Sequence, residues 1–263
     1  MDKKSQRKWY VVWAGRKPGI YRDWASCKEQ IDGFSGARFK SFLSQNEAEA
    51  AYGKPIGGKR VATPPVQSGT RVNKAKPGPV TLSKAQVAKC ATAVQIFVDG
   101  ACNPNPGEAG SGVAVYRYGV LSSLWYGRYR TVGTNNYAEL AALHYGLVLA
   151  GEAIEREETV TLFADSTYAI QCVTKWASSW EKKGWVRKQG PIQNLELIRD
   201  MHALYQPLVG KIAIEHVNGH VGIEGNELAD RMSLLAINEL EHGWRRYPDP
   251  LIVDDILSAS YCA

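Results

Sequence analysis

Four acidic residues lie in sequence surroundings where a charge is costly. Asp99 and Asp165 each follow an apolar segment typical of a buried strand. Glu139 lies within the Ala- and Leu-rich segment 137–143, where a charge on the buried side of a helix must be paired or bound to metal. Asp230 follows Glu227 by three residues, so both share one face of a predicted helix. Taken singly, Asp99 and Asp165 could each be a helix cap or a turn former, and Asp230 could be a surface residue beside Arg231.

The elements expected between residues 94 and 240 can bring these carboxylates together. Apolar and alternating segments predict strands over Gln95–Asp99, Gly110–Arg117, Ser122–Tyr129, Thr159–Ala164 and Lys211–Val217. Helical patterns cover Asn136–Gly151, a segment from Ser166, Gln193–Tyr205 and Asn226–Leu240. This alternation predicts one α/β domain with a five-stranded mixed sheet. If the strands that end at Asp99 and Asp165 are parallel neighbours, both carboxylates emerge at one sheet edge, where such sheets place their sites.

The flanking segments have their own organisation. Residues 8–53 predict a small α/β domain with strands over Lys8–Ala14, Ile20–Arg22 and Arg38–Leu43 and helices over Trp24–Ile31 and Asn46–Tyr52, with Ser26 and Asn46 as capping residues. Residues 54–93 are rich in Pro and Gly and contain no acid, which predicts a flexible basic linker ending in a helical turn or two over Ser83–Ala93. Residues 241–263 could be a docking tail, a packed extension or a segment without a role.

Charge is distributed unevenly along the chain. Residues 1–54 carry 11 basic and 6 acidic side chains, residues 55–93 seven and none, and residues 94–263 14 and 20. A basic patch favours phosphate backbones through counterion release, and aromatic residues are interleaved with the charges of the first 93 residues. The front of the chain is therefore predicted to bind nucleic acid, the alternative being charged loops that only favour solubility.

Cysteine usage and hydropathy exclude several other classes of protein. The five cysteines are scattered and form no CxxC pair, which argues against a disulfide framework or a zinc site and for a reducing compartment. The apolar run over residues 9–14 ends before Arg16 and Lys17 and is too short for a signal peptide or a membrane span. We therefore expect a cytoplasmic, monomeric protein without membrane contact.

Four strings within residues 94–240 resemble the type 1 ribonuclease H family. They are Val98-Asp99-Gly100, Thr134-Asn-Asn-Tyr-Ala-Glu139-Leu, Ala164-Asp165-Ser166 and His220-Val-Gly-Ile-Glu-Gly-Asn226-Glu-Leu-Ala-Asp230. Each string is a weak signal alone, but the four occur in the family's order and approximate spacing. The resemblance implies a ribonuclease H-like fold whose first three strands are antiparallel. It also implies an endoribonuclease that hydrolyses the RNA strand of RNA–DNA hybrids.

The resemblance makes Asp99, Glu139, Asp165 and Asp230 the catalytic carboxylates and the ligands of two Mg²⁺ ions. Four crowded carboxylates repel one another, and a hard cation that prefers oxygen ligands removes that penalty. Two such ions can activate a water and stabilise the leaving 3′-oxygen, so the expected products carry 5′-phosphate and 3′-hydroxyl ends. Mn²⁺ should substitute for Mg²⁺. By resemblance, His220 is the family's mobile histidine, which moves protons or helps product release; a structural role is the alternative.

Small polar groups beside the carboxylates suit recognition of the 2′-hydroxyl, which distinguishes RNA from DNA locally. By resemblance, Asn105 and Asn135 contact the DNA strand or the sugar edges, while Thr134 and Asn194 form a phosphate pocket for the DNA strand. Trp176, in the Trp- and Lys-rich segment 175–188, reaches the DNA sugar edge. Turn and cap chemistry, or a core position for the tryptophan, are the alternatives.

Residues 8–53 resemble the hybrid-binding domain that precedes the nuclease in many such enzymes. The likeness rests on Trp9-Tyr10-Val-Val, Gly15-Arg16-Lys17-Pro-Gly-Ile-Tyr21, Trp24 and Ala37-Arg38-Phe39-Lys40-Ser41-Phe42. By position, Tyr10, Trp24 and Phe39 line a surface for the DNA strand and Lys40 contacts phosphate. Ser41 stands where the pattern commonly has a second lysine, so a lower affinity is expected. A core position is the alternative for the aromatic residues.

Two other functions remain open on the sequence. One is a hybrid-binding module with an inactive nuclease fold, against which the presence of all four carboxylates argues. The other is a related nuclease such as a transposase or an integrase, which commonly uses fewer acidic residues and different flanking domains.

Overall fold

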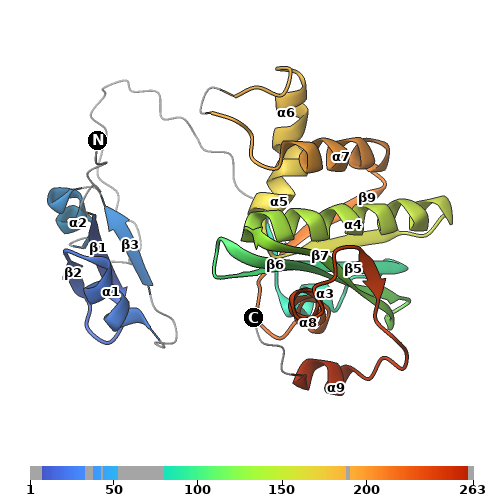
Figure 1. Cartoon of the computed structure of the whole chain (residues 1–263), viewed down its shortest axis with the longest axis horizontal. Helices are drawn as coiled ribbons and strands as arrows, with labels where there is room; N and C mark the ends of the chain where they lie inside the picture. Colours follow the sequence, from blue (N-terminus) through green and yellow to red (C-terminus); the bar gives the residue numbers. More distant parts are fainter. Residues whose placement is uncertain (1–7, 33–37, 43, 53–79, 188–189, 260–263) are drawn as a thin grey trace, which may run out of the picture. The chain divides into compact units, whose positions relative to one another are not determined.

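The computed structural model describes residues 8–259 except 33–37, 43, 53–79 and 188–189. The chain divides into two compact units, one within residues 1–72 and one within residues 73–263 (Figure 1). Each unit is described by itself. The expected flexible linker falls mostly on residues 54–79, outside the described residues.

The N-terminal unit is a three-stranded antiparallel sheet with two helices. Its strands β1 (Trp9–Ala14), β2 (Gly19–Tyr21) and β3 (Arg38–Phe42) lie in the order β2-β1-β3. Helices α1 (Trp24–Ile31) and α2 (Gln45–Tyr52) pack around a small core that includes Val11, Val12 and Cys27. The predicted elements are therefore present, but Asp23 caps α1 in place of Ser26. Its Oδ1 accepts from the Ser26 amide at 2.8 Å, which it can do because it directly precedes the helix. Helix α2 begins at Gln45, so Asn46 lies within it.

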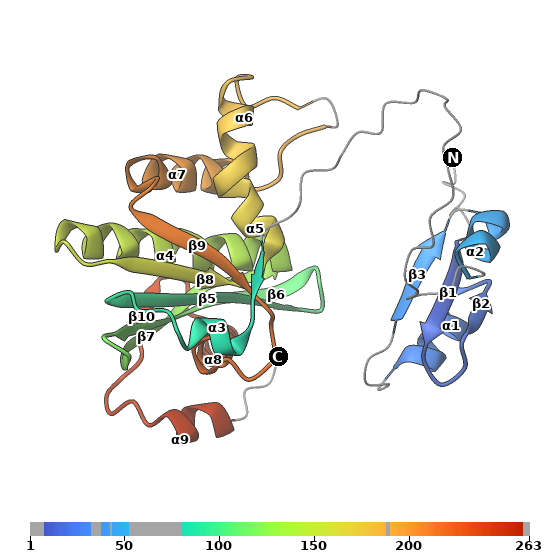
Figure 2. The same cartoon turned by 180° about the vertical axis from the view of Figure 1, so that it is seen from behind.

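The C-terminal unit contains a seven-stranded sheet in the order β10-β7-β6-β5-β8-β9-β4 (Figures 1 and 2). The five predicted strands are β5 (Val94–Asn103), β6 (Gly107–Arg117), β7 (Val120–Gly133), β8 (Val160–Ala164) and β9 (Ile212–Val217). Strands β5, β6 and β7 are antiparallel, as the resemblance implies, and β8 and β9 continue in parallel from β5.

Two further strands come from segments that were not expected to join the sheet. Strand β4 (Thr81–Leu82) pairs in parallel with β9, and a short helix, α3 (Lys84–Val87), follows it. Residues 81–87, expected to belong to a flexible linker that ends at residue 93, are therefore folded onto the nuclease unit, with α3 as the helical turn expected within Ser83–Ala93. The packing of Leu82 and buried Val87 against the core holds this segment on the sheet.

The segment after residue 240 is a packed extension rather than a separate tail. Strand β10 (Trp244–Arg246) pairs antiparallel with β7, and helix α9 (Val253–Ser258) follows. The Trp244 ring stacks on Tyr145 with 4.3 Å between centroids, and Ile256 is buried. Burial of these apolar side chains places the segment on the sheet and on the core beneath it.

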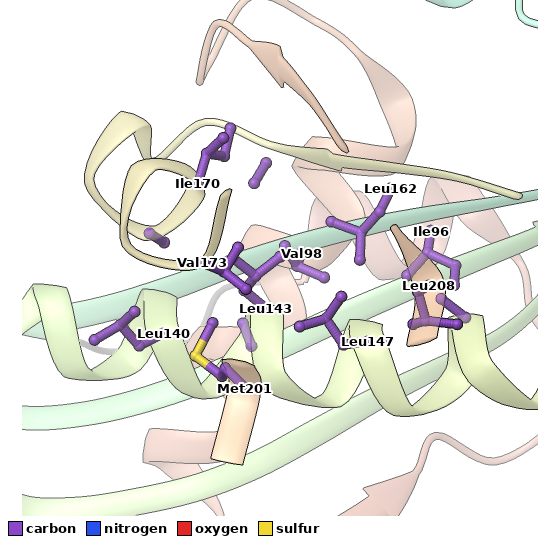
Figure 3. Packing of buried hydrophobic residues seen from close by; sticks show 14 of the residues in the cluster. Ile96, Val98, Leu140, Leu143, Leu147, Leu162, Ile170, Val173, Met201 and Leu208 are labelled. Carbon is purple, nitrogen blue, oxygen red and sulfur yellow. The ribbon is translucent and has the colours of Figure 1, made fainter. Parts of the chain in front are cut away.

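Helices cover both faces of the sheet (Figures 1 and 2). One face packs against α4 (Asn135–Glu155), α5 (Thr167–Gln171) and α7 (Leu195–Tyr205), and the other against α8 (Glu224–Asn238) and α9. Figure 3 shows Leu143 and Leu147 of α4 beside Val98 of β5 in the first of these cores. Because strand side chains alternate, Phe97 enters the second core and stacks on Phe163.

Two element boundaries differ from those expected, and both matter for the site. Helix α4 begins after Thr134, whose hydroxyl accepts from the Tyr137 amide, and runs through Gly151, which is not its end. After α5 the chain makes a π-helical turn over Cys172–Trp176 and then helix α6 (Ala177–Glu181). No helix in the described part of the chain is long and apolar enough to cross a membrane.

Candidate active site and nucleic-acid surfaces

The four predicted carboxylates lie in one cavity of the C-terminal unit. This cavity has a volume of about 280 Å³ and is mainly polar. Its lining consists of Asp99, Gly100, Ala101, Asn135, Glu139, Asp165, His220 and Asp230. The acids come from β5, α4, the end of β8 and α8, which are far apart in the sequence. We call this cavity the carboxylate site.

Strand pairing places Asp99 beside Asp165. The parallel register of β5 and β8 ends at Val98 with Ala164, so the two aspartates are the next residues of adjacent strands. Asp99 was expected to end its strand. It lies instead in the middle of β5, which continues to Asn103 against β6. The Asp99 carboxylate is buried, with 8% of the residue exposed, and accepts from the Gly100 amide at 2.7 Å.

Glu139 reaches the site because α4 lies close to β5. A Cβ at Gly100 would overlap the backbone of Ala138 and Glu139, so the helix can approach this closely only at a glycine. The Asn135 side chain, one turn earlier, donates from Nδ2 to Glu139 Oε1 at 2.6 Å. The Ser166 hydroxyl donates to the other carboxylate oxygen. Both donors fix the orientation of this carboxylate.

A loop between β9 and α8 closes the site and carries His220. Gly219 approaches so closely that a Cβ there would overlap Asp165 Oδ2. His220 has a left-handed backbone with φ of 53° and an exposed side chain. His220 lines the cavity with Asp165 and Asp230, and its imidazole lowers the pKa values of both acids, against the larger effect of burial.

All four carboxyl groups are harder to ionise than free acids. Burial raises the pKa of Asp99 well above its ordinary value, and the charges of Asp165 and Asp230 add to the rise. Burial likewise raises the pKa of Glu139 to about 7, although the Ser166 hydroxyl opposes the change. The pKa values of Asp165 and Asp230 are also raised, in both cases mainly by burial. The folded protein therefore holds an unfavourable concentration of negative charge at this point.

The donor chemistry of the carboxylate site fits a hard divalent cation. Carboxylate oxygens from four elements line it, and a cation would offset both their burial and their mutual repulsion. Among the residues that the structure describes, no three His, Cys, Asp or Glu side chains converge closely enough to hold one ion together.

Two supporting contacts were not predicted from the sequence. His216 on β9 is buried, and its Nε2 lies 2.9 Å from the backbone oxygen of Asp165. Its Nδ1 lies 2.7 Å from the Thr81 hydroxyl on β4. Ser166 was expected only to begin a helix, and it both caps α5 and binds Glu139. The position of Ser166 next to Asp165 is the one signal in the sequence that could have indicated this second role.

The residues expected to contact nucleic acid around the site fall into two groups. Asn105 and Asn135 lie together, since Asn105 Oδ1 accepts from the Asn135 amide at 3.2 Å, and Thr134 is adjacent as the cap of α4. Trp176 packs partly buried against Tyr168 and Trp180, so much of its ring serves the core. Asn194 adopts a left-handed conformation just before α7, and its side chain makes no capping bond.

In the N-terminal unit, three of the predicted residues form one aromatic surface. The Trp24 ring lies 5.5 Å from Tyr10 and 5.6 Å from Phe39 between centroids. Trp24 is 45% exposed and Phe39 is 44% exposed, so these two rings are not core residues. Lys40 is also exposed and lies on the same strand as Phe39. We call Tyr10, Trp24 and Phe39 the aromatic surface.

A larger cavity of about 520 Å³ lies elsewhere in the C-terminal unit. It is lined mainly by apolar groups of α3, β5 and the start of α8, including Val87, Phe97 and Ile223. None of the four carboxylates lines it. The smaller carboxylate site is therefore the candidate active site, because it brings together four carboxylates, whereas the larger cavity is lined by a single one, Glu224.

Comparison with known proteins agrees with this architecture. Residues 91–238 match the family model described as RNase H, and residues 8–52 match that described as Ribonuclease H1 N-terminal domain. A Ribonuclease H of Pseudomonas putida (strain W619) is 36% identical over 148 residues, which is 56% of this chain and 95% of that protein. Ribonuclease H1 of Rattus norvegicus is 30% identical over 253 residues, covering 85% of this chain and 87% of the rat protein.

A solved structure shows the same fold. The crystal structure of LC9-RNase H1, described as a type 1 RNase H with the type 2 active-site motif, has a TM-score of 0.50 and 22% identity, covering 65% of this chain and 82% of that one. The chain therefore belongs to the RNase H family and is a ribonuclease H with a ribonuclease H1 N-terminal domain ahead of its nuclease domain.

Proposed function

We propose that this enzyme hydrolyses the RNA strand of RNA–DNA hybrids at the carboxylate site, giving 5′-phosphate and 3′-hydroxyl ends. The observation that carries the proposal is the convergence of Asp99, Glu139, Asp165 and Asp230 from four separate elements on one polar cavity. Membership of the RNase H family supports the substrate and implies dependence on a divalent metal. The raised pKa values of the four acids supply the physical reason for that dependence.

The four carboxylates would hold two Mg²⁺ ions, with Mn²⁺ able to replace them. When bound, such ions activate an attacking water and offset charge at the leaving 3′-oxygen. The chain itself fixes the geometry: the Gly100 amide orients Asp99, and Asn135 and Ser166 orient Glu139. His220 is exposed on its loop at the mouth of the site, where its imidazole can pass a proton from solvent to the departing 3′-oxygen.

Recognition of the ribose belongs to the polar groups beside Asp99 and Glu139. The Asn135 side chain donates to Glu139, and the Asn105 side chain accepts from the Asn135 backbone amide, so both can bond a 2′-hydroxyl or the sugar edge of the opposite strand. Thr134 and Asn194 are assigned to phosphate of the DNA strand, and the exposed edge of Trp176 to its sugars.

The N-terminal unit holds the hybrid while the C-terminal unit cuts it. The aromatic surface of Tyr10, Trp24 and Phe39 offers ring faces to sugars and bases, and Lys40 offers a cation to phosphate. Such contacts bind without sequence preference. Residues 94–263 carry a net negative charge, 14 basic against 20 acidic side chains, so a separate basic unit compensates for weak attraction of the substrate.

One cleavage assay tests the proposal. A labelled RNA–DNA hybrid is incubated with the full chain and Mg²⁺, with EDTA as one control and an all-DNA duplex as the other. We expect the RNA strand alone to be cut, only with the metal, leaving ends that a ligase accepts directly on the 5′-phosphate side. An uncut hybrid would indicate a hybrid-binding protein with an inactive nuclease fold, and a cut DNA duplex would indicate a different nuclease of the same fold.

A further inference from the structure

A third cavity of the nuclease unit is strongly basic. It has a volume of about 480 Å³, and Arg128, Arg130, Tyr137 and His242 are among the residues that line it. None of these four residues was assigned to a site from the sequence. We call this cavity the basic pocket.

The segment after residue 240 builds one wall of the basic pocket. Strand β10 pairs with β7, and just before it the Gly243 carbonyl accepts from the Arg128 amide at 2.9 Å. His242 Nδ1 lies 3.2 Å from the carbonyl oxygen of Tyr129. These bonds hold Arg128 in a left-handed conformation with φ of 60°, which an arginine adopts at a cost. The C-terminal extension therefore fixes an energetically unfavourable backbone beside this pocket.

The two arginines of the pocket keep their positive charge free for a ligand. Within the described residues, neither Arg128 nor Arg130 takes part in an ion pair. The nearby acid Glu241 is already paired with Arg245 at 2.7 Å. The Arg130 guanidinium lies 3.6 Å from the centre of the Tyr137 ring, which orients it without neutralising it.

The basic pocket adjoins the carboxylate site through the first turn of α4. Tyr137 lines the basic pocket, and Asn135, two residues earlier, lines the carboxylate site. The two cavities are therefore close enough for neighbouring parts of one nucleic-acid backbone to meet both. Guanidinium groups suit this encounter because they bind phosphate oxygens through two parallel hydrogen bonds.

We propose that the basic pocket binds a backbone phosphate of the RNA–DNA hybrid outside the carboxylate site. The inference rests on the proposed function, since the ligand is the substrate of that site. It gives residues 241–243 a role in substrate binding through the conformation that they impose on Arg128. A phosphate is favoured over an acidic peptide because the pocket lies beside a site that a polyanionic backbone must cross.

The test uses two substitutions in the full chain, Arg128→Gly and Arg130→Ala. Glycine is chosen at 128 because it accepts a positive φ and removes the guanidinium without adding strain. Lys211→Ala, which removes an exposed cation outside the pocket, is the control. Cleavage kinetics are measured over a series of salt concentrations, and hybrid binding is measured by fluorescence anisotropy in EDTA. Thermal unfolding checks that each variant folds.

For the double variant we expect KM and the binding Kd to rise about tenfold, while kcat stays within about twofold, because a phosphate contact acts on binding. The slope of log Kd against log salt should fall by about one for one phosphate lost. The same comparison in a Trp24→Ala background should show a larger effect, since the aromatic surface then contributes less. When the hybrid is shortened stepwise from one end, the difference in Kd between the double variant and the parent enzyme should disappear at a defined length.

An unchanged KM and salt slope in a folded double variant would overturn the proposal. A loss of kcat with unchanged KM would also overturn it, because it would make the arginines positioning residues for the carboxylate site. Failure of the unsubstituted enzyme to cut hybrid would instead contradict the proposed function, and anisotropy with the same hybrid would still report on the pocket.

Discussion

The ionisation of Glu139 should make the metal-free enzyme less stable as the pH rises, and Glu139→Gln should remove that effect. The pKa of this carboxyl is raised from 4.5 to about 7. Below pH 4.5 the group is protonated in both folded and unfolded chains, so it costs nothing. As the pH rises toward 7, the unfolded chain releases its proton before the folded one does, and the folded state loses stability.

The size of the effect follows from the two pKa values. A difference of about 2.5 between them corresponds to about 3 kcal/mol above pH 7, since each pKa unit is worth 1.36 kcal/mol. Glutamine offers only one amide oxygen to the two donors Asn135 and Ser166. The substitution therefore lowers the free energy of unfolding by about 1 kcal/mol at every pH. At pH 8 the variant should therefore be about 2 kcal/mol more stable than the parent, and at pH 4 about 1 kcal/mol less stable.

The measurement is urea unfolding of the full chain in EDTA, followed by circular dichroism from pH 4 to pH 8. Glu155→Gln, on the exposed side of the same helix, is the control, and its difference in stability from the parent should be the same at pH 4 and pH 8. Added Mg²⁺ should reverse the order at pH 8, because it stabilises the parent more than the variant. A difference between Glu139→Gln and the parent that is the same at pH 4 and pH 8 would refute the reasoning.

Three other substitutions test separate parts of the site. Asp99→Asn should lower kcat for hybrid cleavage by about a thousandfold or more while the binding Kd in EDTA stays within about threefold, because it removes a central metal ligand; cleavage at the parent rate would disprove its assignment. Gly219→Ala should lower kcat about tenfold with little change in KM, because its Cβ would overlap the Asp165 carboxylate and force the loop away from it. Full activity would show that the loop can move without disturbing the site. Trp24→Ala should raise KM about tenfold through the loss of one stacking partner, with kcat unchanged, whereas Tyr118→Ala, exposed on the nuclease unit, should leave KM unaltered; equal KM values for the two variants would contradict a role for the aromatic surface.

The sequence predicts the main elements because they are long and strongly patterned. Strands β5, β6 and β8 each bury a run of mainly apolar residues, and the order of strands and helices from β5 to β9 along the chain is typical of an α/β domain. Strands β4 and β10 have two and three residues, which is too short for any periodicity to appear. Their positions depend on tertiary contacts, such as the stacking of Trp244 on Tyr145, that no local pattern encodes.

The candidate site divides in the same way. Each carboxylate is marked by its own surroundings, and the structure brings Asp99, Glu139, Asp165 and Asp230 to one cavity. Their supporting contacts could not be predicted, because the bond from His216 to the Asp165 backbone depends on the register of β8 against β9. Likewise, the basic pocket joins Arg128 on β7 to a segment more than a hundred residues later in the chain.

Strand β4 has a mechanical consequence. The chain that arrives from the N-terminal unit joins the nuclease at Thr81, whose hydroxyl contacts His216, which in turn contacts the backbone of Asp165. A force applied at Thr81 would therefore reach the backbone of Asp165, a residue of the carboxylate site, through two hydrogen bonds. A nuclease fragment that begins at residue 94 would lack the contact between Thr81 and His216, whereas one that begins at residue 80 would keep it. The point at which the chain enters the nuclease unit thus also supports the position of Asp165.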